Sequence, residues 1–317
     1  MSPGAIDVAV VTVTYNSEGV IQGFLDSLNA GMRGLSWQLV VADNASRDGT
    51  VEAVERWAAD HPEAGCIVVQ TGYNAGYAAG INAALAKAGP YHAALVLNPD
   101  LRLRPDSGRR MADLAARTPD AGIVVPRMFD ESGDPAHSLR REPTLLRGFG
   151  EAVLGARAGR FPRLGELVLD EAAYTAETRA DWATGAAMYI TGDCLARCGP
   201  WDESFLLYSE ETEYSLRARD LGLATVLAPE AAVVHIGGES DVSPRLWTLL
   251  TINKLRFYRR RRGLPAAVAY WAALMLREAP RAAAGQRRSR KAVGALLSPS
   301  LLRDPRTVLP GTAPSDP

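Results

Sequence analysis

The chain has 317 residues, of which 47% are hydrophobic and 22% are charged, with a formal net charge of −1. This length and apolar content allow a large core, as one big α/β domain or two fused halves. The balanced charge argues against a general nucleic-acid-binding protein. The charge is uneven, however, because residues Lys254 to Lys291 hold twelve Lys or Arg and one acid, Glu278.

The N-terminal half alternates strand-like and helix-like segments. A β-branched run at Ile6–Thr14 is typical of a strand buried on both faces. The expected elements that follow are a helix at Gly19–Asn29, a strand at Trp37–Ala42 ending at Asp43, a helix opened by Ser46, a strand at Cys66–Gln70, a helix at Ala75–Lys87 and a strand at His92–Leu97. Strands alternating with helices imply right-handed crossovers and therefore a parallel sheet.

The C-terminal half is less regular. Residues 143 to about 180 are rich in Gly, Ala, Arg and Pro, which indicates a loop-and-helix insertion. The other expected elements are strands at Gly122–Met128, Ala224–Leu227 and Ala231–His235, and helices at Glu211–Leu221, Leu246–Arg261 and about Pro265–Arg277. The proline-rich end, from Ser298, is expected to fray. Cys194 and Cys198 are interpreted as two small buried hydrophobic residues on a short helix.

No secretory signal is expected, because the N-terminus enters a strand without a basic region and an apolar stretch. The longest apolar run, Leu264–Leu276, is shorter than the ~20 residues that span a bilayer. We therefore expect a cytoplasmic protein, either soluble or peripheral at the inner face of the membrane. The basic C-terminal segment favours contact with an anionic membrane surface. The alternative is that Leu264–Leu276 packs on the rest of the protein while the arginines face water.

Polar residues follow the first two strands. Thr14, Tyr15 and Asn16 end the first strand, and Asp43 ends the second. Since open α/β folds bind ligands at the carboxyl ends of their strands, these side chains are candidates for a ligand site. Backbone groups there can hold a planar base beside Tyr15, and Asp43 can accept a hydrogen bond from the imide N–H of uracil or thymine. The alternative is an ordinary turn.

Further motifs occur downstream. The segment Gly72–Asn82, GYNAGYAAGIN, has small residues that let a backbone approach a ligand, although they also suit helix packing. Its glycine spacing differs from the dinucleotide-binding motif, and no P-loop occurs. Asn98-Pro-Asp100 follows an apolar run, where a simple turn is the alternative. Glu210 and Glu211 begin a helix, a place where acids are also favoured by the helix dipole.

Three more segments complete the pattern: Trp182-Ala-Thr-Gly185-Ala186, the stretch WDESFLLYSEETEYSLRARDLG at 201–222, and His235 before Ile-Gly-Gly. Taken with the motifs above, they resemble family 2 glycosyltransferases. The resemblance covers roughly residues 5 to 262 and is closest to the rhamnosyltransferase-like branch. It implies the GT-A fold, a Rossmann-like, mostly parallel sheet flanked by helices, with C-terminal helices. The implied domains are a GT-A domain at 1–262, with a donor half to about 130 and an acceptor half from 131, and a basic helical extension with a proline-rich tail at 263–317.

The resemblance also implies site residues. Contacts to the nucleotide sugar are expected from Thr14, Tyr15, Asn16, Asp43, Asn74, Gly76, Asn82 and Asn98. Contacts to the acceptor are expected from Trp182, Gly185 and Ala186. Asp100 and His235 would hold Mg²⁺ or Mn²⁺ against the donor diphosphate. Asn98 replaces the first Asp of the family's usual metal-binding motif. One carboxylate together with phosphate oxygens is nevertheless sufficient to bind Mg²⁺. Glu211 stands where the family has its general base, an Asp, and Glu210 remains the other candidate.

The implied activity is inverting transfer of a sugar from a dTDP- or UDP-sugar, commonly dTDP-L-rhamnose in this branch. The acceptor would be a glycan, a lipid-linked sugar or a natural product. A sugar nucleotidyltransferase is the first alternative, but VTVTYNSEGV lacks the basic glycine-rich loop it needs. A non-catalytic nucleotide-sugar or glycan-binding scaffold is the second, and binding without turnover would support it. The oligomeric state is left open, a homo-oligomer included.

Overall fold

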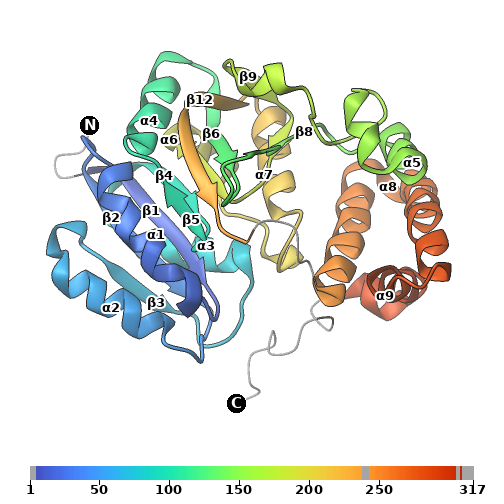
Figure 1. The fold of residues 1–317 in the computed structure, drawn as a ribbon, viewed down its shortest axis with the longest axis horizontal. Coiled ribbons are helices and arrows are strands. Elements are labelled where there is room, and N and C mark those ends of the chain that lie inside the picture. Colours follow the sequence, from blue (N-terminus) through green and yellow to red (C-terminus); the bar gives the residue numbers. More distant parts are fainter. Residues whose placement is uncertain (1–4, 238–242, 305–307, 309–317) are drawn as a thin grey trace.

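A central sheet with helices on both faces, and a helical lobe beside it, make up the protein (Figure 1). The computed structural model describes residues 5–237, 243–304 and 308. The sheet has the spatial order β3 (Ile67–Gln70), β2 (Trp37–Asp43), β1 (Ile6–Thr14), β4 (Tyr91–Leu97), β11 (Ala187–Thr191), β6 (Ala121–Phe129), β12 (Ala224–His235) and β5 (Leu101–Leu103).

The expected direction of the strands is confirmed for most of the sheet. β3, β2, β1 and β4 are parallel neighbours, and β12 is parallel to β6. β11 lies antiparallel between β4 and β6, which the sequence pattern did not predict. The shorter strands are β7 (Pro135–Ala136) on β6, β9 (Thr178–Ala180) on β12, and the pair β8 (Leu139–Arg140) and β10 (Trp182–Ala183).

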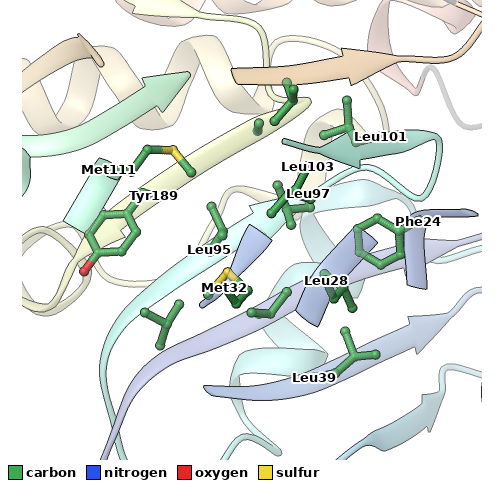
Figure 2. Close-up of a cluster of buried hydrophobic side chains, with 14 of the residues drawn as sticks. Phe24, Leu28, Met32, Leu39, Leu95, Leu97, Leu101, Leu103, Met111 and Tyr189 are labelled. Atoms are coloured by element: carbon green, nitrogen blue, oxygen red, sulfur yellow. The ribbon is translucent and has the colours of Figure 1, made fainter. Parts of the chain in front are cut away.

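Helices cover both faces because successive side chains of a strand point to opposite sides. In β1, Val8 and Val10 join one core and Val11 and Val13 the other. The first core, shown in Figure 2, lies under α1 (Glu18–Gly31), α2 (Thr50–Asp60) and α4 (Ser107–Arg117). The second lies under α3 (Tyr77–Leu85), α6 (Gly192–Cys198) and α7 (Glu210–Asp220). Short 3₁₀ turns are η1 (Pro62–Ala64), η2 (Gly155–Arg160), η3 (Glu171–Tyr174) and η4 (Glu203–Phe205).

The helical lobe contains α5 (Leu145–Leu154), α8 (Pro244–Ala283), α9 (Arg287–Leu296) and α10 (Pro299–Arg303). α8 is kinked at Gly263, whose φ of 79° suits glycine. The boundary expected at residue 262 falls at this kink. However, α5 packs closely on the second half of α8, since a Cβ added to Gly148 would lie 2.8 Å from the Tyr270 ring. A separate domain at 263–317 therefore stays a prediction.

Some expected elements differ from the observed ones. The two strands expected at 224–235 are one irregular strand, β12, and the sequence pattern did not predict α4 or α9. The insertion at 143–180 contains α5 and 3₁₀ turns, as expected. Within the end expected to fray from Ser298, the structure has the short helix α10, and residues 305–307 and 309–317 lie outside the described residues. Cys194 and Cys198 are buried and free, which confirms their interpretation.

Six of the twelve basic residues from Lys254 to Lys291 form ion pairs, namely Lys254, Arg260, Arg261, Arg262, Arg277 and Arg281. Lys254 pairs with Glu166 at 3.1 Å, Arg260 with Asp202 at 2.7 Å, and Arg261 with Asp220 at 2.8 Å. These cations therefore do not simply face water, as the packing alternative supposed. One face of 264–276 is buried in the lobe through Tyr270 and Leu274, while Leu264, Val268 and Leu276 are exposed. Within the described part of the chain, no helix is long and apolar enough to cross a bilayer.

Candidate active site

The ends of β1 and β2 meet in one hydrogen-bonded cluster. The register places Thr14 beside Asp43, and the Thr14 hydroxyl donates to the Asp43 carboxylate at 2.8 Å. The backbone N–H of Ser46 donates to the same carboxylate at 2.9 Å. Asp43 is only 2% exposed, and these hydrogen bonds hold its carboxylate in place at the edge of the sheet.

The loop after β1 is held against the loop after β2. Asn16 adopts a φ of 51°, and its backbone N–H donates to the Ser46 hydroxyl at 2.9 Å. Its side-chain oxygen accepts the backbone N–H of Arg47 at 2.8 Å. Tyr15, by contrast, is 45% exposed. The cluster thus combines a rigid polar base with an open aromatic side chain.

The glycine-rich segment joins this edge to the second half of the protein. Gly76 has a φ of 93°, and a Cβ there would lie 2.4 Å from the Leu206 carbonyl oxygen. The Asn74 side-chain oxygen accepts the Gly76 N–H at 3.2 Å. The Asn82 amide donates to the Trp201 carbonyl at 3.0 Å and accepts the Trp201 N–H at 2.9 Å. Asn82 therefore bonds across the protein, and its expected contact to a donor stays a prediction.

Asp100 and His235 are brought together by the sheet. β5 pairs antiparallel with the end of β12, so that His235 lies beside Leu101. The His235 Nε2 atom is 3.1 Å from the Asp100 Oδ2 atom. The other carboxylate oxygen, Oδ1, is buried without a hydrogen-bond partner among the described residues.

These two residues fit a divalent metal ion. Two ligands at right angles on an ion with ~2.1 Å bonds lie about 3 Å apart, which is close to the observed spacing. The unpartnered Oδ1 atom is a second free acceptor at the same place. No group of three or more His, Cys, Asp or Glu suited to a metal occurs among the described residues. A metal held here would take its remaining ligands from phosphate oxygens and water.

The segment predicted to contact the acceptor lies between Asn98, which follows β4, and Glu211 of α7. The Asn98 N–H donates to the Ala186 carbonyl at 2.8 Å. A Cβ on Gly185 would lie 3.1 Å from the Glu211 Cβ. Trp182 is buried, and its indole N–H donates to the Arg141 carbonyl at 3.0 Å. Glycine at position 185 therefore leaves room for Glu211 beside the segment.

The two acids of α7 have different surroundings. Glu210 is 2% exposed, and its Oε2 atom has no partner among the described residues. Burial and the neighbouring charge of Glu211 raise the pKa of Glu210 well above its usual range. Burial raises the pKa of Glu211 to about 7. Burial thus favours the protonated form of Glu210, while Glu211, with a pKa of about 7, can exchange a proton near neutral pH.

Tyr77, in the glycine-rich segment, connects these groups, although the sequence pattern did not indicate a role for it. Its hydroxyl donates to the Gly185 carbonyl at 3.0 Å. Burial raises the pKa of Tyr77 well above its usual value, with further contributions from Glu210, Asp100 and Glu211. The ring therefore lies among the predicted metal ligand and both candidate bases.

The loop before α7 is strained and is held by a residue that sequence patterns did not reveal. Leu206, Tyr208 and Ser209 all have positive φ, which costs about 1–3 kcal/mol each. Asn253, fully buried in α8, donates through its amide to the carbonyls of Phe205 at 2.6 Å and Leu207 at 2.9 Å. No sequence signal identified Asn253, because its partners lie more than forty residues away.

Replacing Asn253 tests this support. In Asn253→Asp the side chain keeps its shape but can no longer donate to the loop carbonyls, so we expect turnover to fall about tenfold or more and the free energy of unfolding to fall by ~1–3 kcal/mol. Thr251→Val is the matched control, because its hydroxyl bonds only to the Trp247 carbonyl in the same helix. Kinetics and chemical denaturation measure both effects, and equal turnover in the two variants would contradict the role of Asn253.

Comparison with known proteins identifies the family. The model of glycosyl transferase family 2 matches residues 9–167, half of the chain. The chain is 31% identical over 238 residues to the N-acetylglucosaminyl-diphospho-decaprenol L-rhamnosyltransferase of Mycobacterium tuberculosis, covering 71% of this chain and 75% of that protein. It is 29% identical over 217 residues to the low-salt glycan biosynthesis hexosyltransferase Agl10 of Haloferax volcanii, covering 67% and 62%. The chain belongs to glycosyl transferase family 2 and is a glycosyltransferase.

Solved structures agree with the fold. The mannosyltransferase PcManGT from Pyrobaculum calidifontis, in complex with GDP-Man and Mn²⁺, has a TM-score of 0.57 at 19% identity, covering 93% of this chain and 81% of that one. TarS residues 1–349 of S. aureus, in complex with UDP, has a TM-score of 0.52 at 16% identity, covering 92% and 90%. The expected GT-A fold is confirmed.

Proposed function

We propose that this protein is an inverting glycosyltransferase that transfers L-rhamnose from dTDP-L-rhamnose to a hydroxyl group of a lipid-linked sugar, with Mg²⁺ or Mn²⁺ at Asp100 and His235. The observation that carries the proposal is the gathering of the Asp100–His235 pair, Glu211 and the Gly185 segment around Tyr77. The choice of sugar and acceptor rests on the 31% identical rhamnosyltransferase.

Each group has a chemical task in this proposal. The cluster of Thr14, Tyr15, Asn16 and Asp43 binds the nucleotide base. A divalent ion, when bound, neutralises the charge that develops on the leaving diphosphate. Glu211 accepts the proton of the attacking hydroxyl, since its pKa of about 7 suits a general base at neutral pH. The raised pKa of Glu210 disfavours a second negative charge beside Glu211, and Tyr77 holds the Gly185 segment in place.

The pH dependence of turnover tests the assignment of the base. Because Glu211 must be ionised to accept a proton, we expect kcat to rise about tenfold per unit below pH ~7 and to level off above it. Glu210→Gln should keep this profile, because the raised pKa of Glu210 favours its neutral form, which the amide resembles in charge. A pH–rate profile at saturating substrates measures both, and a limb that disappears in Glu210→Gln would exchange the two roles.

The two alternatives predict other results. A sugar nucleotidyltransferase would form a sugar nucleotide from a nucleoside triphosphate and a sugar phosphate. A non-catalytic scaffold would bind a nucleotide sugar without turning it over. Neither accounts for a partly buried carboxyl whose pKa is raised to about 7 beside the segment that resembles an acceptor site.

A donor screen tests the proposed substrate. Thermal unfolding would be followed with dTDP-L-rhamnose, UDP-sugars and GDP-sugars, each with and without Mn²⁺. We expect the largest stabilisation with dTDP-L-rhamnose and Mn²⁺ together, since ligands that bind the native state raise its stability. Stronger stabilisation by a GDP-sugar would overturn the proposed donor. Product analysis with a soluble acceptor analogue then decides between transfer and binding alone.

A further inference from the structure

The segment at residues 145–163 exposes an apolar stripe. On α5, Leu146, Phe149 and Val153 follow the spacing i, i+3, i+7 and therefore lie on one face of the helix. Leu146 is 55% exposed and Val153 is 73% exposed. Another face of α5 is buried, because Gly148 packs on Tyr270 of α8. Phe161, just after η2, is exposed as well.

Three arginines lie in the same segment. Arg157, Arg160 and Arg163 are all exposed. Within residues 5–237, 243–304 and 308, none of the three guanidinium groups forms an ion pair or a hydrogen bond. This distinguishes them from Arg260 and Arg261 of α8, which pair with acids of the GT-A domain. Positive charge on this side of the lobe is thus available to a partner.

The residues that flank this segment on both sides reach a cavity that the candidate base Glu211 also lines. Pro143, two residues before it, and Glu166, three residues after it, line a small cavity of about 20 Å³. Trp182 and Glu211 line the same cavity. The segment is therefore joined at both ends to residues that line the cavity beside the candidate base.

We infer that residues 145–163, which we call the docking segment, bind the surface of an anionic lipid bilayer. An apolar helix face with neighbouring arginines inserts shallowly between lipid headgroups while its cations attract anionic lipids. The inference rests on the proposed function and extends it, because a lipid-linked acceptor is held at the surface of a bilayer. It differs from the sequence-based expectation, which placed the membrane contact in the basic C-terminal segment.

Vesicle co-sedimentation of the full chain at low salt tests the inference. We expect binding to vesicles of phosphatidylglycerol and phosphatidylcholine, and little binding to phosphatidylcholine alone. The triple variant Arg157→Gln, Arg160→Gln, Arg163→Gln should bind about a hundredfold more weakly, because each cation near the surface contributes about fivefold. Val153→Ser with Phe161→Ser should weaken binding about tenfold or more, because exposed apolar area is lost from the interface.

The matched control removes three charges from another helix. Arg287→Gln, Arg288→Gln, Arg290→Gln changes exposed arginines of α9 and should leave vesicle binding within a few-fold of wild type. Equal loss in both triple variants, or no vesicle binding by the wild-type chain, would overturn the inference. So would a dimer in sedimentation analysis that Val153→Ser dissociates, because the apolar stripe would then be covered by a second copy.

The readouts separate the docking segment from the proposed function. Transfer to a soluble acceptor analogue should be unchanged in the docking variants, because none of their residues belongs to the candidate site. A wild-type chain that binds vesicles but transfers no sugar would overturn the proposed function and leave the docking segment standing. Far-ultraviolet circular dichroism confirms that each variant is folded.

Discussion

Glu211→Gln should lower kcat by about 10²–10⁴, with the affinity for the donor nucleotide largely kept. The amide has nearly the size and hydrogen-bonding capacity of the carboxylate, but it cannot accept the proton of the attacking hydroxyl. Gly185 packs on the Glu211 Cβ atom, so a side chain of equal shape leaves the segment undisturbed. Single-turnover kinetics together with donor titration measure the two effects separately.

Glu210→Gln is the matched control for this variant. It changes the adjacent carboxyl, whose pKa is raised well above the usual range by burial and by Glu211. Because the raised pKa favours the neutral acid, which an amide matches in charge, this variant should keep turnover within about tenfold of wild type. An inactive Glu210→Gln beside an active Glu211→Gln would assign the base to Glu210 instead.

Asp100→Asn should cost about 10² or more in turnover and should abolish stabilisation of the protein by Mn²⁺ with donor nucleotide. The change removes the negative charge at the place where Asp100 and His235 meet. It also replaces the buried, unpartnered Oδ1 atom, one of the two oxygens that a cation could use. Thermal unfolding with and without Mn²⁺ gives a readout that does not depend on activity.

Asp106→Asn is a suitable control, because it also removes an aspartate charge near the C-terminal side of β5. Asp106 has a φ of 63°, a conformation that Asn tolerates well, and it pairs only loosely with Arg33 at 3.6 Å. We expect wild-type turnover and an unchanged response to Mn²⁺. If Asp100→Asn stays fully active in metal-depleted buffer, the metal site proposed here is wrong.

Local patterns predicted the donor half of the sheet well. The β-branched runs of β1 and β2 are buried on both faces, so their composition alone indicates a strand and places Thr14 and Asp43 at its end. The same patterns did not predict the antiparallel direction of β11, because the apolar composition of a strand does not indicate the direction in which the strand runs in a sheet. The helix α4 was missed because only Met111 and Leu114 are large apolar residues buried on it.

The sequence by itself determined the family, the parallel donor half and the list of acids at strand and helix ends, because periodicity and motif spacing are local properties of the chain. Only the tertiary structure decided how those acids differ. Glu210 and Glu211 are identical in type and burial raises the pKa of both, but the neighbouring charge raises it further only at Glu210. The pairing of β5 with β12 joins Asp100 to His235, 135 residues apart. Ion pairs across the fold likewise neutralise part of the basic stretch of α8 and leave the arginines after α5 available, because contacts between distant residues arise only from packing.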